Sequence, residues 1–339
     1  MSLFLFLTIS ASAQKAVKFV TDEKSKKVDV LVDGKLFTSY IYPDDLDKPV
    51  LYPIYTSNGT VITRGFPRDP RPGERVDHPH HVGLWFNYGD VNGLDFWNNS
   101  YAIPADKKAS YGSVRHKKVV KAEGGKTNGT LVVNTEWVDY QGNVLLNEES
   151  TFVFSGTDNE RVIDRTTKLT GKAKGEVVFK ETKEGMMGLR VDRAFEEPAT
   201  KAEVFTDASG QPTAVPVLNN EGVNGVYRNS NGIEKGDVWG KRANWVVLSA
   251  TKGNEPISIA MVDHKNNFGY PAHWHARGYG LFAINNLAAK VYVPTDEEMK
   301  YSLANGQSLT FKHRIVVRSG QFLSDDEMNK HFQQFNTNK

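Results

Sequence analysis

The sequence contains no cysteine at any of its 339 positions. This absence excludes disulfides, thiolate metal ligands, lipid-modified cysteine anchors and cysteine nucleophiles, so stability has to come from packing alone. The formal net charge is only +2, from 42 basic and 40 acidic side chains. Such a balance gives no general electrostatic reason to expect nucleic acid or an anionic membrane as a partner. We therefore expect a small molecule or a glycan as partner, and the oligomeric state stays open.

Long apolar runs and several well-known motifs are also missing. After the N-terminus no stretch approaches the roughly 20 apolar residues that a membrane helix needs, so we expect a soluble mature chain with no membrane insertion. The sequence has no Gly-x-Gly-x-x-Gly, P-loop, Gly-x-Ser-x-Gly or His-Glu-x-x-His pattern. Dinucleotide, nucleotide, α/β-hydrolase and zincin chemistry therefore have no support, and we expect no cofactor.

The N-terminus begins with an apolar segment that ends in Ala11-Ser12-Ala13. This small-x-small pattern is typical of a signal-peptidase site. We predict a signal peptide over residues 1–13 and one mature domain over residues 14–339, in the periplasm or secreted. A buried N-terminal strand is the alternative, since the basic residues that usually precede the apolar run are missing.

Short runs rich in β-branched and aromatic residues recur along the chain, with turn residues between them. They predict strands at residues 28–37, 131–140, 149–153, 161–169, 177–181, 245–248, 257–262 and 309–317. Many strands without intervening helices predict an all-β fold, specifically a large antiparallel β super-sandwich. Only the C-terminus predicts a short helix, where Ser324 and Glu327 match a capping box ahead of Met328.

The strongest chemical signal is a pair of histidine-rich segments. The first spans residues 77–87. If a strand begins at His80, its period of two places His81 and Trp85 on a polar face and Val82 on the opposite, core face. This segment therefore predicts a polar platform that carries an aromatic ring.

The second histidine-rich segment spans residues 273–282 and alternates more cleanly. His273, His275, Arg277 and Tyr279 fall on one face of the predicted strand. Glycines occupy part of the other face, which lets a neighbouring element approach closely. Four polar or amphipathic side chains on one strand face predict a binding site.

Other candidate residues flank the two segments. Asp77 begins the first segment, and Trp97 follows it after a predicted turn. Arg64 precedes the proline-rich loop that leads into the first segment, and such a loop is a candidate active-site loop. Asp263 and His264 end a predicted strand shortly before the second segment, so we expect them, with Arg64, at the edge of the same pocket.

Two carboxylates, Glu181 and Glu184, lie between lysines at the end of a predicted strand. A solvated turn is one interpretation of this mixture of charges. The other is catalytic, because a histidine that exchanges protons needs a partner group. In that case Glu184 is the first choice and Glu181 the second.

Three kinds of site fit a polar face with histidine, arginine and aromatic side chains. In a sugar site the rings stack on a pyranose, and the polar groups bond its hydroxyls. In a metal site the His-x-His spacing places two imidazoles on one strand face. In the third case the histidines are hydrogen-bonding residues of a groove without chemistry.

Several motifs resemble those of the PmoA-like family of exported bacterial proteins. The resemblance covers residues 50–315 and rests on five motifs: Asp77 to Trp85, Asp90 to Trp97, Lys183 to Gly185, Trp239 to Trp245, and Asp263-His264 with Trp274 to Phe282. PmoA-like proteins are similar in architecture to galactose mutarotase-like super-sandwiches. The resemblance implies sugar binding on a concave sheet and proton transfer by histidine and a carboxylate.

These signals predict an exported carbohydrate-processing protein. We expect acid/base chemistry on a sugar or oxidised sugar, such as epimerisation, elimination or glycosidic cleavage, with His81 and His275 as the proton-transfer pair. Arg277 would stabilise developing oxyanion charge. No residue is assigned as a metal ligand. A non-catalytic carbohydrate-binding protein and a metal-dependent enzyme with a histidine cluster stay open as alternatives, as do the sugar and the bond.

Overall fold

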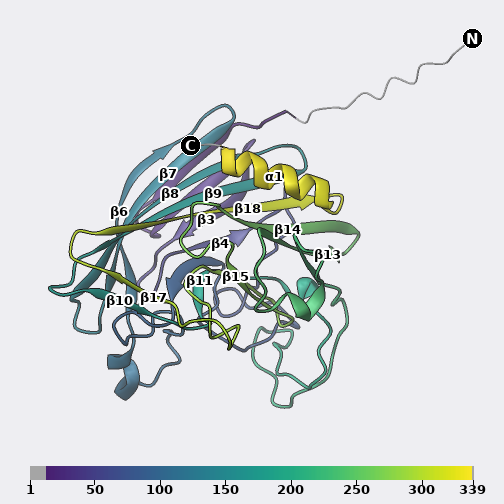
Figure 1. Cartoon of the computed structure of the whole chain (residues 1–339). Helices are drawn as coiled ribbons and strands as arrows, with labels where there is room; N and C mark the ends of the chain where they lie inside the picture. The colour runs from purple at the N-terminus through teal and green to yellow at the C-terminus, as the bar shows by residue number, and fades with distance from the viewer. Residues whose placement is uncertain (1–12, 338–339) are drawn as a thin grey trace, which may run out of the picture.

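The computed structural model describes residues 13–337. The predicted signal peptide lies outside the described residues, apart from Ala13. Strands dominate the described chain, and two large sheets pack against each other with a helix along one side (Figure 1). The predicted all-β, antiparallel super-sandwich is confirmed. Among residues 13–337, no helix has the length and apolarity needed to cross a membrane.

The first sheet of the described chain has eight strands, which begin at one edge with the N-terminal hairpins. In spatial order they are β1 (Val17–Asp22), β2 (Lys27–Val32), β3 (Lys35–Ile41), β4 (Val50–Ile54), β5 (Leu84–Tyr88), β11 (Gly185–Arg190), β16 (Leu281–Asn285) and β15 (His273–Arg277). Segments far apart in sequence therefore meet at the end formed by β5, β11, β16 and β15. This end contains both histidine-rich segments.

The second sheet also has eight strands within the described residues, and these are longer. In spatial order they are β12 (Val226–Asn229), β13 (Trp245–Lys252), β14 (Glu255–Asp263), β18 (Ser308–Ser319), β9 (Glu160–Gly171), β8 (Val144–Gly156), β7 (Asn128–Val138) and β6 (Ser113–Glu123). Two strands predicted after residue 131 are not part of this sheet: the one at 177–181 and the one at 273–282, which is divided into β15 and β16 of the first sheet, with Tyr279 in the turn between them. The others lie within one of these strands or extend slightly beyond one. The strand predicted at 177–181 forms β10 (Val177–Lys180), which pairs with β17 (Lys300–Leu303).

Alternation of side chains explains how these strands build the core. Along β7, Leu131, Val133, Thr135 and Trp137 are buried while the residues that alternate with them are more exposed. From the other sheet, Phe86 of β5 lies 6.4 Å from Trp137, measured between ring centroids. The apolar faces of both sheets therefore form one core, as expected for stacked antiparallel sheets.

The C-terminal helix α1 (Asp325–Thr337) begins as predicted. The amide and hydroxyl of Ser324 both donate to the carboxylate of Glu327 at 2.9 Å, and the Glu327 amide donates back to the Ser324 hydroxyl at 3.3 Å. This is the predicted capping box. Met328 and Phe335 of α1 pack in a cluster with residues of β13, β14 and β18, so the helix covers the outer face of the second sheet (Figure 1).

Three short 3₁₀ helices, η1 (Ala105–Ser110), η2 (Arg193–Phe195) and η3 (Lys235–Val238), lie in the connections. At the far edge of the second sheet, β6 pairs with β7 but its register shifts twice, between His116 and Lys118 and between Val119 and Lys121. Such shifts mark bulges, which bend and twist a strand. The edge of this sheet is therefore irregular.

The strand of the first histidine-rich segment begins later than predicted, at Leu84 and not at His80. The chain first turns, since the His81 amide donates to the carbonyl of residue 78 at 3.0 Å, and Gly83 has a φ of +56° that favours glycine. The prediction that Val82 faces the inter-sheet core is therefore wrong. Val82 packs in a separate cluster with Trp85.

Candidate functional site

The candidate site lies on the face of the first sheet that points away from the second sheet. On β5, Phe86 packs into the core between the sheets, whereas Trp85 packs in a different apolar cluster. Because neighbours along a strand point to opposite faces, Trp85 faces the outer side. Residues that pair with Trp85 across the sheet share this side.

One row of paired residues runs across the four strands of this end. His275 on β15 pairs with Ala283, Ala283 with Gly188, and Gly188 with Trp85. His275 and Trp85 are thus three strand spacings apart, or about 14 Å between backbones. A Cβ atom on Gly188 would come within 2.5 Å of the Trp85 ring. Ala283 and Gly188 therefore form a floor of small side chains between the His275 imidazole and the Trp85 indole.

Stacked rings connect the two histidine-rich segments above this floor. The ring of Tyr279 stacks on His78 at 4.9 Å, His78 on His81 at 4.8 Å, and His81 on Trp85 at 5.1 Å. The Trp97 ring meets Trp85 edge to face at 5.1 Å. The two segments, nearly 200 residues apart in sequence, therefore share one aromatic cluster. The meeting of the two segments was predicted, but His81 and Tyr279 lie outside the strands on which the alternating patterns placed them.

Three buried N–H groups of this aromatic cluster have no partner in the described chain: His81 Nε2, Trp85 Nε1 and Trp97 Nε1. All three side chains are at most 1% exposed. Buried polar groups almost always have hydrogen-bond partners, and each exception calls for an explanation such as a bound water or ligand. We interpret the cluster as the inner wall of a ligand site.

Asp77 is the centre of a charged group beside the rings. Its carboxylate accepts from Arg190 at 2.6 Å, from Arg64 at 2.8 Å and from His78 at 2.5 Å. Burial alone would raise the pKa of Asp77, but Arg190, His78 and Arg64 together hold it well below its ordinary value. Asp77 is therefore ionised, and it orients three side chains of the site.

Arg64 is almost completely buried and bonds mainly to the protein. Its guanidinium donates to the carbonyls of Arg75, Asp77, His78 and His81. These bonds hold the end of the proline-rich loop in place. Arg64, predicted to bind substrate at the edge of the pocket, thus has the contacts of a residue that positions the first histidine segment.

His81 and His275 have opposite tautomers. Arg190 can only donate, and its Nη1 lies 3.3 Å from His81 Nδ1, so Nδ1 accepts and Nε2 carries the proton. His275 Nδ1 lies 3.1 Å from the carbonyl oxygen of Lys183, so here Nδ1 carries the proton and Nε2 has the lone pair. These assignments follow from the hydrogen-bond network. One imidazole can donate into the site, and the other can accept.

Glu184 lies next to His275, with its carboxylate 3.6 Å from His275 Nδ1. Burial raises the pKa of Glu184 and lowers that of His275 to about 3. Burial also lowers the pKa of His81 well below its ordinary value. Both imidazoles are therefore neutral near pH 7, and a carboxyl group with a raised pKa lies beside one of them.

Two further predicted residues lie on β15. His273 Nδ1 bonds the carbonyl of Gly240 at 2.8 Å, and its ring stacks on Tyr292 at 5.0 Å. Arg277 is exposed, and its guanidinium lies 5.8 Å from the Tyr279 ring centre. His273 is buried and Arg277 is open to solvent, so the row along β15 runs from the interior to the surface.

The structure gives Glu181 a different role from the predicted one. Its carboxylate accepts from the amides of Ala289, Val291 and Met299. Both oxygens are occupied, so Glu181 anchors the loop over residues 289–299. It is not placed as a second catalytic carboxylate beside Glu184.

The predicted position of Asp263 and His264 at the edge of the same pocket is wrong. Asp263 is fully buried and accepts from the side-chain amides of Asn267 and Asn286 and from the Ala272 amide. His264 packs edge to face on Phe335 of α1 at 5.2 Å. Because Asp263 is the last residue of β14, the next side chain points to the opposite face of the sheet.

Four residues of this region were not predicted from the sequence: His78, Arg190, Tyr292 and Lys48. A signal existed for Arg190, which is two residues from Gly188 and so shares its strand face. His78 belongs to the motif from Asp77 to Trp85, but it lies outside any strand, so alternation along a strand could not place its side chain. Nothing in the sequence pattern points to Lys48 or Tyr292, since their positions depend on loops.

A metal site was the second interpretation of the histidines. Within residues 13–337 no group of three or more histidine, aspartate or glutamate side chains is placed to hold a metal ion. The rings of His78, His80 and His81 instead stack or meet edge to face. These three histidines therefore contact one another as aromatic rings.

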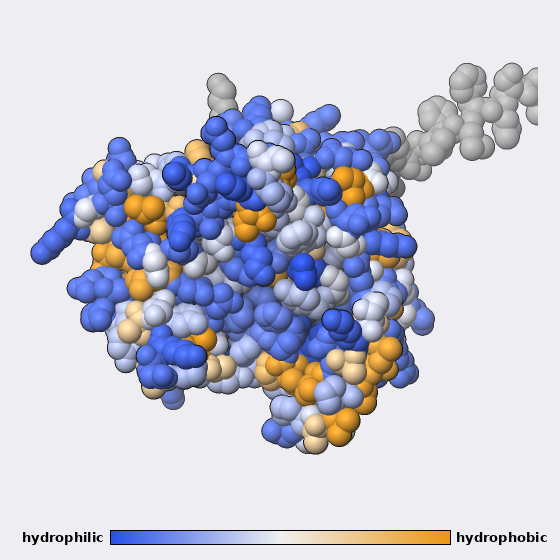
Figure 2. All heavy atoms as spheres, turned by 60° about the horizontal axis from the view of Figure 1, so that its bottom comes forward, coloured by the Kyte–Doolittle hydropathy of each residue, from blue (hydrophilic) through white to orange (hydrophobic). Residues whose placement is uncertain are grey.

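The lower end of the molecule in Figure 1, where loops lie below β11 and β15, comes forward in Figure 2. Hydrophilic side chains cover most of the middle of this face, and apolar side chains gather on a protruding lobe at its lower edge (Figure 2). The surface near this end of the first sheet is therefore mainly polar.

Comparisons with known proteins give a family and a set of distant structures. The model of a family of unknown function, DUF6807, matches residues 27–333. The family description includes neither an activity nor the PmoA-like label, so that part of the resemblance stays a prediction. No curated protein sequence matches the chain.

Solved structures similar to this chain include three carbohydrate-related proteins. A galactose mutarotase-like protein from Clostridium acetobutylicum is 9% identical with a TM-score of 0.37, covering 90% of this chain and 99% of that one. The galactosidase domain of an α-galactosidase-sucrose kinase is 10% identical with a TM-score of 0.39, covering 89% and 41%. An α-galactosidase from Geobacillus stearothermophilus is 11% identical with a TM-score of 0.39, covering 91% and 41%. This chain thus spans about two fifths of either galactosidase structure.

Proposed function

We propose, from the premise that the chain belongs to the family of unknown function DUF6807, that it binds a sugar or sugar-derived carbonyl compound and catalyses proton transfer on it. The observation that carries this proposal is the pair of opposite imidazole tautomers, on His81 and His275, at the two sides of one floor. Acid/base chemistry needs a donor and an acceptor that face the same substrate.

The aromatic cluster supplies the binding part of the proposal. Tyr279 and His78 are the outer members of the stack, and Trp85 and Trp97 are the inner ones. Aromatic faces suit the apolar face of a pyranose, while fixed N–H groups suit its hydroxyls. The exposed His78 and the partly exposed Tyr279 would contact the ligand, and the buried inner rings support them from beneath.

The proton-transfer part rests on two neutral imidazoles and one carboxyl group. His275 Nε2 accepts a proton from the substrate, and Glu184, whose pKa is raised by burial, lies beside Nδ1 of the same ring as a second proton-exchanging group. His81 donates a hydrogen bond through Nε2 to an oxygen that gains negative charge, as an uncharged imidazole can do. Arg190 holds His81 in this tautomer, and the exposed Arg277 adds positive charge at the surface.

The proposed cellular location is the periplasm or the extracellular space, as the first 13 residues predict. Epimerisation, elimination and glycosidic cleavage all include a proton-transfer step of this kind. The proposal therefore specifies the proton chemistry and leaves the bond to experiment. A protein of this type would work without a cofactor.

Proton NMR in deuterated water tests the function. The purified full chain is incubated with neutral and oxidised sugars, and exchange of carbon-bound protons and product formation are followed. His275→Ala and Glu184→Gln should each lower the rate by about 10²- to 10⁴-fold, the usual effect of removing a general acid or base. Thermal melting of each variant checks that it is folded.

Two matched variants serve as controls. His331→Ala removes a histidine of α1, and Glu123→Gln neutralises an exposed carboxylate at the end of β6; both should exchange at the wild-type rate. Full activity in His275→Ala and Glu184→Gln would rule out the assigned roles. Sugar binding without exchange or product in the wild type would favour the carbohydrate-binding alternative.

A further inference from the structure

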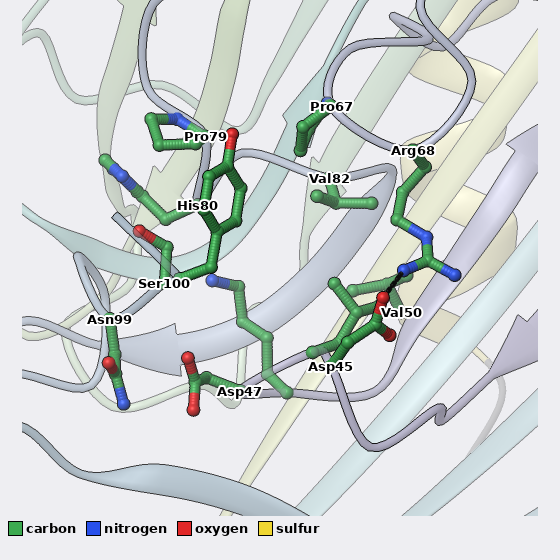
Figure 3. A pocket seen from close by; sticks show the side chains of 13 residues that line it. Asp45, Asp47, Val50, Pro67, Arg68, Pro79, His80, Val82, Asn99 and Ser100 are labelled. Carbon is green, nitrogen blue, oxygen red and sulfur yellow. Dashed lines mark hydrogen bonds and ion pairs between the residues drawn. The ribbon is translucent and has the colours of Figure 1, made fainter. Parts of the chain in front are cut away.

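A small pocket adjoins the aromatic cluster on the side of β4. It has a volume of about 100 Å³, and its lining includes Lys48, His80, Ser100 and Tyr101. Figure 3 shows His80 and Ser100 along one side of the pocket and the pair of Asp45 and Arg68 on the other. Complete small-molecule sites usually measure about 300–1,000 Å³. The pocket therefore suits one end of a ligand.

Lys48 is the unusual residue of this pocket. It is only 5% exposed, and its ammonium lies 5.5 Å from the centre of the Trp85 ring. Its single hydrogen bond in the described chain is a long one, at 3.4 Å to the Trp97 carbonyl. An ammonium group has three donors, so a buried positive charge has unused hydrogen-bonding capacity at the pocket.

The acidic residues near Lys48 already have other partners. Asp45 pairs with Arg68. Asp47 accepts from Ser113 at 3.0 Å and from Arg115 at 3.3 Å. Within the described residues no carboxylate lies within the 4.0 Å of Lys48 that defines an ion pair. Burial lowers the pKa of Lys48 to about 8, and Asp47 and Asp95 only partly oppose this. Lys48 thus stays mainly charged at neutral pH, without a local counter-ion.

His80 provides a second observation at the same place. Its Nε2 is buried and has no partner in the described chain. Its ring meets His81 edge to face at 4.3 Å, which joins the pocket to the proposed catalytic cluster. Tyr101, which is 64% exposed, also lines the pocket. An ammonium, an imidazole and an aromatic ring together suit a sugar that carries an anionic group.

We propose that Lys48 and His80 form a subsite for the carboxylate of an acidic sugar, next to the proton-transfer residues. This inference rests on the proposed function and names its substrate class. The carboxylate supplies the counter-ion that Lys48 lacks, and the sugar ring extends past His80 toward the exposed Tyr101, which also lines the pocket. A charge-assisted hydrogen bond in a buried pocket is strong and directional. Neutral sugars fill the same space without this bond.

Calorimetric titration of the full chain tests the subsite. The probes are D-glucuronate and D-galacturonate, each compared with its neutral methyl ester. The wild type should bind each acid about 10- to 100-fold more tightly than its ester, as expected for a hydrogen bond to a charged group. Because the ester removes the charge from the ligand, this comparison needs no protein variant.

Lys48→Met removes the charge from the protein. Replacing a buried unpaired charge by an apolar side chain of similar length is expected to leave the fold intact. This variant should bind acid and ester equally, while Lys126→Met, which removes an exposed charge elsewhere, should keep the preference for the acid. If Lys48→Met does not fold, the affinities of the wild type for each acid and its methyl ester test the subsite instead.

Three results overturn the subsite: equal wild-type affinity for acid and ester, a preference that survives in folded Lys48→Met, or no binding of any acid probe. The proposed function fails separately. If His275→Ala still exchanges substrate protons, the acid/base role is lost while the preference for the acid remains. If the preference is absent but neutral sugars exchange, only the subsite is lost.

Discussion

Two Asp-His dipeptides of this chain look equivalent in sequence but occupy different environments. In Asp77-His78 the two side chains bond each other at 2.5 Å and lie among the site residues. In Asp263-His264 they separate, because Asp263 faces the interior and the ring of His264 packs on α1. The first dipeptide lies in a loop where His78 has a φ of +46°, and the second lies at a strand end. Backbone conformation therefore decides whether neighbours cooperate.

The two aspartates also differ in the charge of their partners. Asp77 is surrounded by two arginines, which keep it ionised. Asp263 accepts mainly from neutral amides, and burial raises its pKa to about 6. His313, at 3.9 Å from Asp263, has a pKa lowered to about 3 by burial and so offers no positive charge. A carboxylate held between fixed positive charges can orient a ligand, whereas Asp263, whose partners are neutral, serves packing.

The largest expected effect comes from Asp77→Asn. It leaves Arg64 and Arg190, both at most 1% exposed, without their shared carboxylate. Breaking a buried ion pair costs about 3–5 kcal/mol of the free energy of unfolding. Urea denaturation at pH 7 should show this loss, and a smaller one for Asp263→Asn. A smaller loss in Asp77→Asn than in Asp263→Asn would contradict the conclusion that the charged partners of Asp77 distinguish the two dipeptides.

The second prediction concerns the pH dependence that Asp263 adds. Because its folded-state pKa of about 6 exceeds its ordinary value of 3.8, the native state holds this proton over a range where the unfolded state has lost it. Its contribution is thus fully present below pH 3.8 and is lost as pH rises through 6, a change of about 3 kcal/mol. The free energy of unfolding of wild type minus that of Asp263→Asn, measured from pH 3.5 to 7.5, should fall by this amount. Taking this difference removes the pH-dependent contribution of the buried histidines, because both proteins contain them. A difference that does not change with pH would contradict the prediction.

The smallest effect is expected for His264→Phe. An aromatic ring keeps the contact with Phe335 and loses only the bond from the Asn266 amide, which lies 3.2 Å from Nδ1. The free energy of unfolding should change by about 0.5–1.5 kcal/mol, and deuterium exchange should match the wild type. His78→Phe, the matched change in the other dipeptide, should instead weaken sugar binding. Equal binding by both variants would show that the dipeptides do not differ in function.

Sequence alone predicted much of the fold because its signals are local. Period-two alternation depends on neighbours along one strand, and the capping box of α1 involves only residues 324–327. The shared face of His273, His275 and Arg277 followed from the same rule. Such rules apply within a segment. The positions of most strands and the first residues of α1 could therefore be predicted from the sequence.

The site was predictable only in part, because its partners come from distant segments. Asp77 and Arg190 are 113 residues apart in sequence. Glu181 and Glu184 look alike in sequence, yet loop amides occupy the first and leave the second beside His275. Alternation specifies which residues share a face. It does not specify which loop covers that face or which carboxylate a loop amide will bind.

The irregular edge strand β6 has a consequence for how copies of the protein behave at high concentration. An unpaired strand edge invites another chain to add to the sheet, which leads to aggregates. In β6 Lys117, Lys118 and Lys121 are exposed along the edge, with Lys117 paired to Glu136 and Lys121 to Glu123. The two register shifts interrupt the row of amides and carbonyls that a new strand would need. We expect this edge to oppose self-association even in a crowded compartment. Removing the lysines would leave the two register shifts as the remaining obstacle to pairing at this edge.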